Sequence, residues 1–193
     1  MKAYKLTDSK NQTQNNTQWG ENISHTATGK SANLCSDGWI HFYTNELIAV
    51  LLNSIHANFS NPHLWECETE GEHHHEPLKL GCKTLTTIKQ IPLPEISVTQ
   101  RIAFGILCGK EVCHDEQWNK WADNWLNNTD RSYASAAADA AAAVHAACAA
   151  DAAARAADAA WSAACAADAA ARAADAGKKI DFIAIAQKAM TYS

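Results

Sequence analysis

The sequence predicts an α+β fold in which a small mixed N-terminal module is followed by helices, including a long Ala-rich helix. Period-two alternation of side chains marks a strand near residue 65, which indicates a sheet in the first half. Helical periodicity follows Pro94, and 29 of the 43 residues from 134 to 176 are alanine. We therefore expect two modules, residues 1–94 and 95–193.

The chain opens with Lys2–Leu6, whose pattern is typical of a first strand. Residues 8–34 are rich in Asn, Gln, Thr and Ser and predict a long irregular loop. Ile40–Tyr43 reads as the next strand. Thr44 is then the expected N-terminal cap of a buried helix over Asn45–Asn53.

The segment Leu64–Glu72 alternates strictly, which predicts a strand with one acidic face. The acidic side chains are Glu66, Glu68, Glu70 and Glu72. A second run over Leu78–Ile91 predicts its hairpin partner, with Glu70–Pro77 as the connecting loop. Lysines of the second strand are then expected opposite the glutamates as cross-strand pairs.

The second module begins after Pro92 and Pro94. Ser97 or Thr99 is expected to cap a helix over Thr99–Cys113 that has a broad apolar face. The tryptophans at 118, 121 and 125 are spaced by three and four residues, which places three indoles on one helix face. Such a stripe is typical of a buried core.

The alanine tract over residues 132–176 predicts helix because alanine is the best helix former. Gly177 suits its C-terminal end, and a further helix is expected over 179–191. An unbroken tract from 134 to 176 would be about 65 Å long at about 1.5 Å per residue. The tract is therefore either one protruding helix or an antiparallel pair, and the sequence leaves both open.

Charged residues repeat along this tract with a period of 17 residues, in steps of three and four that form one stripe. The stripe contains Asp151, Arg155, Asp158, Asp168, Arg172 and Asp175. These six residues, here called the Asp/Arg stripe, are the predicted partner-binding residues. The flanking methyl surface also leaves self-association open.

Composition excludes several classes of function. The formal net charge is -5 and the pI is near 6.0, which makes direct binding of nucleic acid unexpected. No apolar run is long enough to span a membrane, and the N-terminus lacks the apolar core of a signal peptide, so we expect a cytoplasmic protein. The seven cysteines then read as free thiols. We expect no cofactor and no metal, although Cys108, Cys113 and His114, or the run His73–His75, offer metal-binding side chains.

Several segments carry a resemblance to a known group of proteins. They are Asp37–Thr44, Leu47–Asn58, Leu64–Glu66, Lys79–Cys82, Thr99–Cys108, Trp121–Leu126 and Asp130–Ser132, in that order. In these segments the chain resembles uncharacterised proteins of phages and bacteria that join a small α+β module to an Ala-rich helical tail. Their tail is similar to segments of the immunity-protein type, which implies protein binding rather than catalysis.

The first module also resembles, in its layout, the folds of ADP-ribosyltransferases. The similarity lies in a short first strand, a long polar loop, the segment Gly38–Thr44 before a helix, and a strand that begins with Trp65 and Glu66. It implies His41, Tyr43 and Glu66 or Glu68 as catalytic candidates. The His or Arg that those folds carry on the early strand is missing here, where Tyr4 and Lys5 stand.

These observations favour a non-enzymatic protein of phage or mobile-element origin that binds and blocks a protein partner in the host bacterium. An anti-defence protein of the anti-CRISPR kind and an immunity protein against a toxin are two concrete forms. The first alternative is an ADP-ribosyltransferase-like enzyme or a degenerate nucleotide-binding module. The second is an oligomerising structural protein, such as a virion component.

Overall fold

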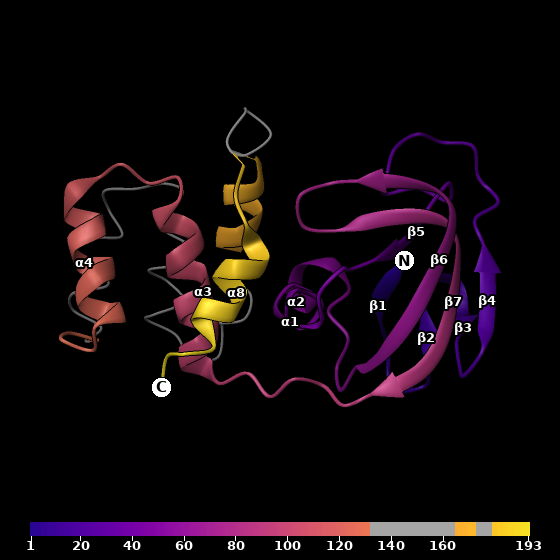
Figure 1. Ribbon diagram of the computed structural model, residues 1–193, viewed down its shortest axis with the longest axis horizontal. Coiled ribbons are helices and arrows are strands. Elements are labelled where there is room, and N and C mark those ends of the chain that lie inside the picture. The colour runs from indigo at the N-terminus through magenta and orange to yellow at the C-terminus, as the bar shows by residue number, and fades with distance from the viewer. Residues whose placement is uncertain (132–164, 173–178) are drawn as a thin grey trace. The chain divides into compact units, whose positions relative to one another are not determined.

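The computed structural model describes residues 1–131, 165–172 and 179–193, and it confirms the α+β prediction (Figure 1). The chain divides into two compact units, Met1–Pro94 and Glu95–Ser193. The first unit holds an antiparallel sheet with two short helices, and the second is helical in its described part. Most of the predicted Ala-rich helix over 132–176 lies outside the described residues.

The sheet of the first unit is organised around one long hairpin. Strand β6 (His63–His75) pairs with β7 (Leu80–Ile91), and β1 (Lys2–Thr7) pairs with the other edge of β6, all antiparallel. Two short strands share the far edge of β7, with β5 (Ile40–Phe42) near its start and β4 (Ile23–Thr26) further along. Figure 1 shows β6 and β7 as the longest strands.

Strands β1, β6, β7 and β5 form a closed ring of backbone pairing. Tyr4 of β1 and Tyr43, just after β5, exchange reciprocal backbone hydrogen bonds of 2.8 and 2.9 Å. Pairing therefore runs from β1 through β6, β7 and β5 back to β1. The side chains of one buried cluster fill this ring: Ala3, Trp19, Phe42, Trp65, Cys67, Cys82 and Leu85.

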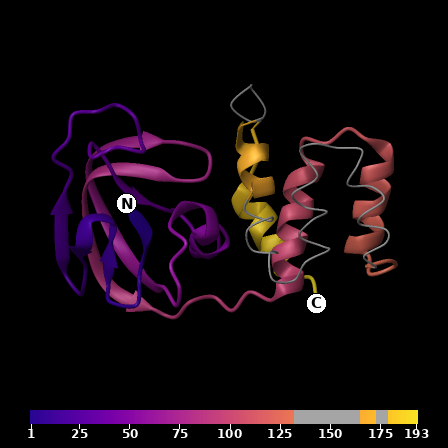
Figure 2. The ribbon, with the colours of Figure 1, turned by 180° about the vertical axis from the view of Figure 1, so that it is seen from behind.

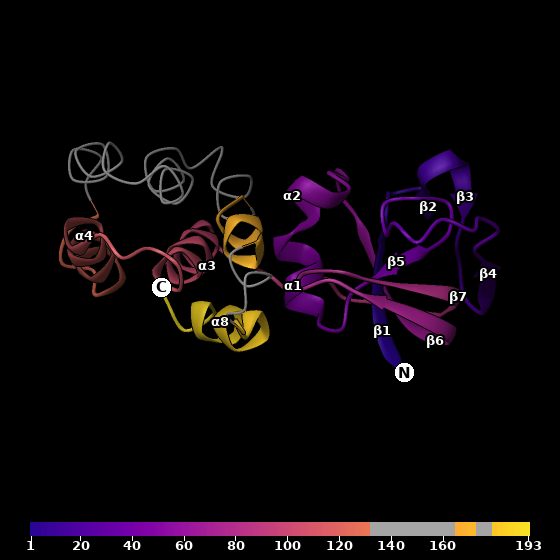
Figure 3. The ribbon, with the colours of Figure 1, turned by 90° about the horizontal axis from the view of Figure 1, so that it is seen from above.

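The helices α1 (Glu46–Leu51) and α2 (Asn53–His56) follow β5, and α1 packs beside β1 (Figure 3). The expected cap at Thr44 was wrong, because the helix begins one residue later. The side chain of Asn45 accepts hydrogen bonds from the amides of Leu47 and Ile48 instead.

The polar segment 8–34 is not one irregular loop, as the sequence suggested. It contains β2 (Gln12–Thr13), a 3₁₀ turn (Gln14–Asn16) and β3 (Thr17–Gln18), which form a small hairpin, and then β4. Its Trp19 is buried in the ring.

The long hairpin extends further than predicted. Pairing continues to His75 opposite Leu80, so the connection is residues 76–79 rather than Glu70–Pro77. A bulge between Glu70 and His73 permits this, and Gly71 takes a φ of +80° within it, which a residue with a Cβ rarely adopts. Glu66 lies opposite Lys89 and forms an ion pair with it, which confirms the expected cross-strand pairing of a lysine with a glutamate at this position.

The second unit begins with α3 (Val98–Lys110), close to the helix predicted from residue 99. Ser97 and Gln100 form a capping box at its start, with reciprocal hydrogen bonds of 3.2 and 2.8 Å. Helix α8 (Phe182–Ala189) lies along α3, as Figures 1 and 2 show.

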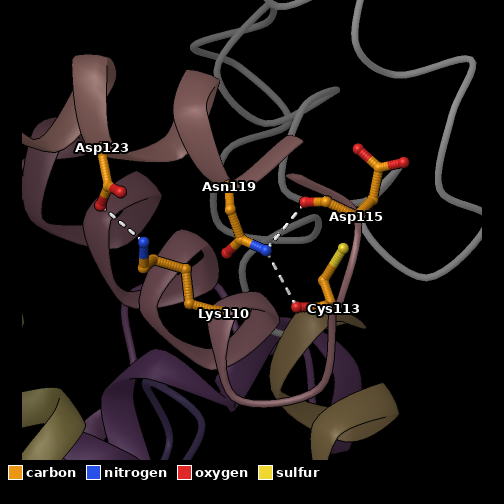
Figure 4. A network of polar contacts seen from close by, with 5 residues as sticks. All are labelled: Lys110, Cys113, Asp115, Asn119 and Asp123. Carbon is orange, nitrogen blue, oxygen red and sulfur yellow. Dashed lines mark hydrogen bonds and ion pairs between the residues drawn. The ribbon is translucent and has the colours of Figure 1, made fainter. Parts of the chain in front are cut away.

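Helix α4 (Glu116–Leu126) buries the tryptophan stripe, which confirms its prediction as core. Figure 4 shows how polar contacts fix its start: the Asn119 amide donates to the carbonyls of Cys113 and Asp115, at 3.1 and 2.8 Å. An ion pair between Lys110 and Asp123 links α3 to α4. Among the described residues no helix is both long and apolar enough to cross a membrane.

Candidate functional site

A pocket of about 360 Å³ opens at the edge of the strand ring in the first unit. Strand β1 contributes Lys5 and Leu6, and the region of β5 contributes His41 and Tyr43. The polar hairpin, the end of α2 and the hairpin connection supply the remaining wall: Thr13, Gln14, His56, Ala57, Phe59 and Lys79. Its size lies at the lower end of the range for small-molecule sites.

The most unusual group in this wall is the Lys5 side chain. Residues alternate across a strand, so Lys5 faces the ring interior together with Ala3 and Thr7, and all three are buried. Its ammonium donates a hydrogen bond of 2.9 Å to the backbone carbonyl of His41 and lies 4.8 Å from the centre of the Trp19 ring. The amine is thus held by a carbonyl and an aromatic face.

Burial lowers the pKa of Lys5 from 10.5 to about 8. Desolvation is the main cause, because an ammonium loses its hydration in the ring. The Cys67 and Cys82 thiols nearby act in the opposite direction but do not compensate. Lys5 therefore exchanges its proton closer to neutral pH than an exposed lysine does.

His41 is also fixed in a defined protonation state. Its Nε2 lies 2.6 Å from the carbonyl oxygen of Leu34, and a carbonyl oxygen only accepts, so Nε2 carries the hydrogen. Desolvation lowers the pKa of His41, and the positive charges of Lys79 and Lys5 add to this effect. The imidazole is therefore neutral at pH 7, with its lone pair on Nδ1.

Tyr43 and His56 form a second polar pair in the wall. The Tyr43 hydroxyl lies 2.9 Å from His56 Nδ1, and the two rings stack with an interplanar angle of 17°. Burial raises the pKa of Tyr43, so its phenol keeps its proton. This pair, together with Phe59, gives the pocket a flat aromatic side with polar atoms at its edge.

The electrostatic balance of the pocket is positive. Among the described residues, Lys5 and Lys79 belong to its wall, and no Asp or Glu does. The carboxylate of Glu76 acts on the pKa of His41 from outside that wall. Two amines, hydroxyl groups and imidazoles around an apolar side can hold a small anion that carries a planar or apolar body.

The four catalytic candidates from the sequence do not all meet here. His41 and Tyr43 line the pocket, whereas Glu66 and Glu68 do not. Glu66 forms ion pairs of 3.4 Å with Lys2 and 3.8 Å with Lys89, and Glu68 is exposed. Both lie on the face of β6 opposite the buried Cys67.

Of the Asp/Arg stripe, Asp168 and Arg172 lie within the described residues. They occupy a helical segment over 165–172 and form an ion pair of 2.8 Å. Asp151, Arg155, Asp158 and Asp175 lie outside the described residues.

Sequence reasoning missed Lys5, His56, Phe59 and Lys79 as site residues. A signal for Lys5 was present: it shares one face of its strand with Ala3 and Thr7, so a buried strand would carry its amine inward. No local pattern marks Lys79 or Phe59, because chain folding brings them to the pocket from distant segments.

Comparison with known proteins provides no further guide. No family model matches the chain, and neither the curated proteins nor the solved structures yield a match. The function must be inferred from the pocket and the surface.

Proposed function

We propose that the chain is a binding protein whose N-terminal unit takes a small anionic ligand, of the size of a mononucleotide, in the Lys5 pocket. The observation that carries this proposal is that two lysines, and no carboxylate, stand among the described residues of the wall. The proposal extends the alternative from the sequence analysis that the first module binds a nucleotide. Two of the residues that the resemblance implies, His41 and Tyr43, line this pocket.

The chemistry of the wall favours a phosphate ester over a simple inorganic ion. Lys79 and Lys5 offer charge-assisted hydrogen bonds to a phosphate group. Leu6, Ala57 and Phe59 offer an apolar surface that an inorganic ion would leave exposed, whereas a base or sugar would cover it. We therefore expect tighter binding of a mononucleotide than of phosphate alone.

The test is calorimetric titration of the full chain with adenosine monophosphate, inorganic phosphate and adenosine. We expect the monophosphate to bind at least tenfold more tightly than adenosine, because only the former engages the lysines. Lys79→Met should weaken its binding at least tenfold. Thermal unfolding adds a second readout, since a ligand at about 100 times its Kd stabilises the folded state by about 2.7 kcal/mol.

Lys89→Met is the matched control, because Lys89 is an exposed lysine outside the pocket wall. It removes the same charge and should leave binding unchanged. Equal losses in the two lysine variants, or no binding of either anion at millimolar concentration, would contradict the proposal.

A second candidate function is protein binding through the Asp/Arg stripe. The described segment 165–172 favours it, because its alanines at 166, 167, 170 and 171 are buried while Arg172 is largely exposed. The charged pair therefore lies on the solvent side of this helical segment. In this proposal the protein blocks or neutralises a partner, as anti-defence and immunity proteins do.

A further inference from the structure

Among the residues that the structure describes, no carboxylate pairs with the buried amine of Lys5. The groups that act on its pKa are the thiols of Cys67 on β6 and Cys82 on β7, and its ammonium contacts the carbonyl of His41 and the ring of Trp19. A structural lysine in a protein interior normally has an acid beside it, because an unpaired buried ammonium is costly. The described part of the chain gives Lys5 no such partner, and yet Lys5 forms part of a pocket wall.

This environment favours the neutral form of the amine, which is the nucleophilic one. With a pKa of about 8, the neutral form of Lys5 at pH 7 is roughly two orders of magnitude more abundant than that of an ordinary lysine. A neutral amine has two hydrogens and one lone pair. One hydrogen is directed to the His41 carbonyl at 2.9 Å, which orients the nitrogen and leaves the lone pair available.

We propose that Lys5 binds its ligand covalently, by condensing with an aldehyde or ketone group of an anionic molecule held in this pocket. The proposal rests on the proposed function, because the anionic group brings the carbonyl carbon to the amine.

The chemistry balances without an oxidant or reductant. The Nζ lone pair attacks the carbonyl carbon, and the carbonyl oxygen takes up a proton while the nitrogen loses one, which gives a carbinolamine. The hydroxyl group then leaves as water together with the remaining proton of the nitrogen, which forms the C=N bond of an imine. The neutral imidazole of His41 and the Tyr43–His56 pair lie in the same wall and can carry these protons.

Lys79 is the natural comparison within the same wall. It is half-buried, and its Nζ lies 3.0 Å from the Sγ of the exposed Cys35. It therefore lacks the enclosed, dehydrated setting of Lys5. We assign Lys79 to the anionic group and Lys5 to the carbonyl.

The test uses pyridoxal 5′-phosphate as a probe, since it joins an aldehyde to a phosphate ester. The full chain is mixed with one equivalent, reduced with sodium borohydride and digested, and each lysine is quantified by mass spectrometry. We expect at least tenfold more adduct at Lys5 than at any other lysine. Lys5→Arg, which keeps a cation but offers no primary amine, should lose this adduct, whereas Lys89→Met, outside the pocket wall, should keep it.

The pH profile gives a readout that does not depend on the variant folding. In the unmodified chain, the rate of trapping at Lys5 should level off near pH 8, whereas trapping at exposed lysines should still rise near pH 10. Adduct spread evenly over the lysines, or a Lys5 profile equal to theirs, would overturn the inference.

Two probes separate this inference from the proposed function. If adenosine monophosphate binds but no adduct forms at Lys5, the imine is refuted and the anion pocket stands. If pyridoxal without its phosphate labels Lys5 as efficiently and the monophosphate does not bind, the amine is reactive but the anion pocket is refuted, and with it the proposal as stated.

Discussion

At the scale of single residues, Lys5 couples the stability of the first unit to pH. Its pKa is about 8 in the folded chain and 10.5 when exposed, so between these values the unfolded chain binds more protons. Stability contributed by this residue must therefore rise with pH across that window.

Lys5→Met removes this titrating group and serves as the reference. We predict that, between pH 7 and pH 10.5, the unmodified chain gains up to about 3 kcal/mol of unfolding free energy relative to Lys5→Met. Urea denaturation at a series of pH values measures it. The buried thiols act in the opposite direction, because burial raises the pKa of Cys67 to about 12 and of Cys82 to about 11.

These thiols are present in both proteins, so their effect largely cancels in the difference. A difference that stays flat across this pH range would show that Lys5 is not desolvated in the folded chain.

The sequence identified part of the pocket at this scale. The resemblance to ADP-ribosyltransferase folds implies His41 and Tyr43, and both line the pocket. In that resemblance Lys5 stands near the position where those folds carry a His or Arg. The fold places Lys5 in the same pocket wall. Period-two alternation correctly predicts that Glu66 and Glu68 lie on the same face of their strand. It does not predict which face of the strand adjoins a pocket.

At the scale of elements, asparagines explain why segment 8–34 was misread. All described residues with positive φ other than glycine are asparagines: Asn11, Asn15, Asn16, Asn22, Asn58, Asn61 and Asn128. Asparagine tolerates the left-handed conformation, so a polar stretch can contain tight turns and very short strands. Strands of two residues are too short for an alternating pattern, and pairing alone defines them.

The start of α3 tests how much a cap contributes to the second unit. Ser97 is exposed, so Ser97→Ala removes the capping hydrogen bond to Gln100 with little loss of packing. We expect the unfolding free energy of this unit to fall by about 1 kcal/mol, measured by chemical denaturation. Ser97→Asp keeps an acceptor and should retain most of the stability. Equal stability of the serine and alanine forms would show that the cap contributes nothing.

At the scale of the whole molecule, the order of a sheet-containing unit before a helical one could be predicted, because period-two alternation and helical periodicity are local properties of the chain. The closed ring could not, since it depends on the bridge between Tyr4 and Tyr43, residues far apart in the sequence. The pocket likewise depends on contacts between residues far apart in the sequence. Its wall gathers residues 5 to 79, and a site assembled over that separation leaves no compact motif.

The chain already carries a net charge of -5, and replacing an arginine by an acid makes it more negative. Such a substitution changes long-range electrostatics as well as a local contact, so a test of partner binding needs a control of equal charge. We predict that Arg155→Glu with Arg172→Glu abolishes capture of a stoichiometric protein partner from a bacterial lysate by the tagged chain, as quantified by mass spectrometry. The matched control is Lys120→Glu with Lys188→Glu, which changes net charge equally at exposed positions outside the stripe. It should leave capture intact.

A third variant separates the sign of each charge from the total charge. Asp168→Arg with Arg172→Asp keeps both the net charge and the possibility of an ion pair at this spacing, but reverses its direction along the helical segment. A partner that reads the stripe should bind this variant at least tenfold more weakly. If capture survives both the double inversion and the reversal, the stripe is only a solvated face, and the pocket of the first unit becomes the remaining candidate for function.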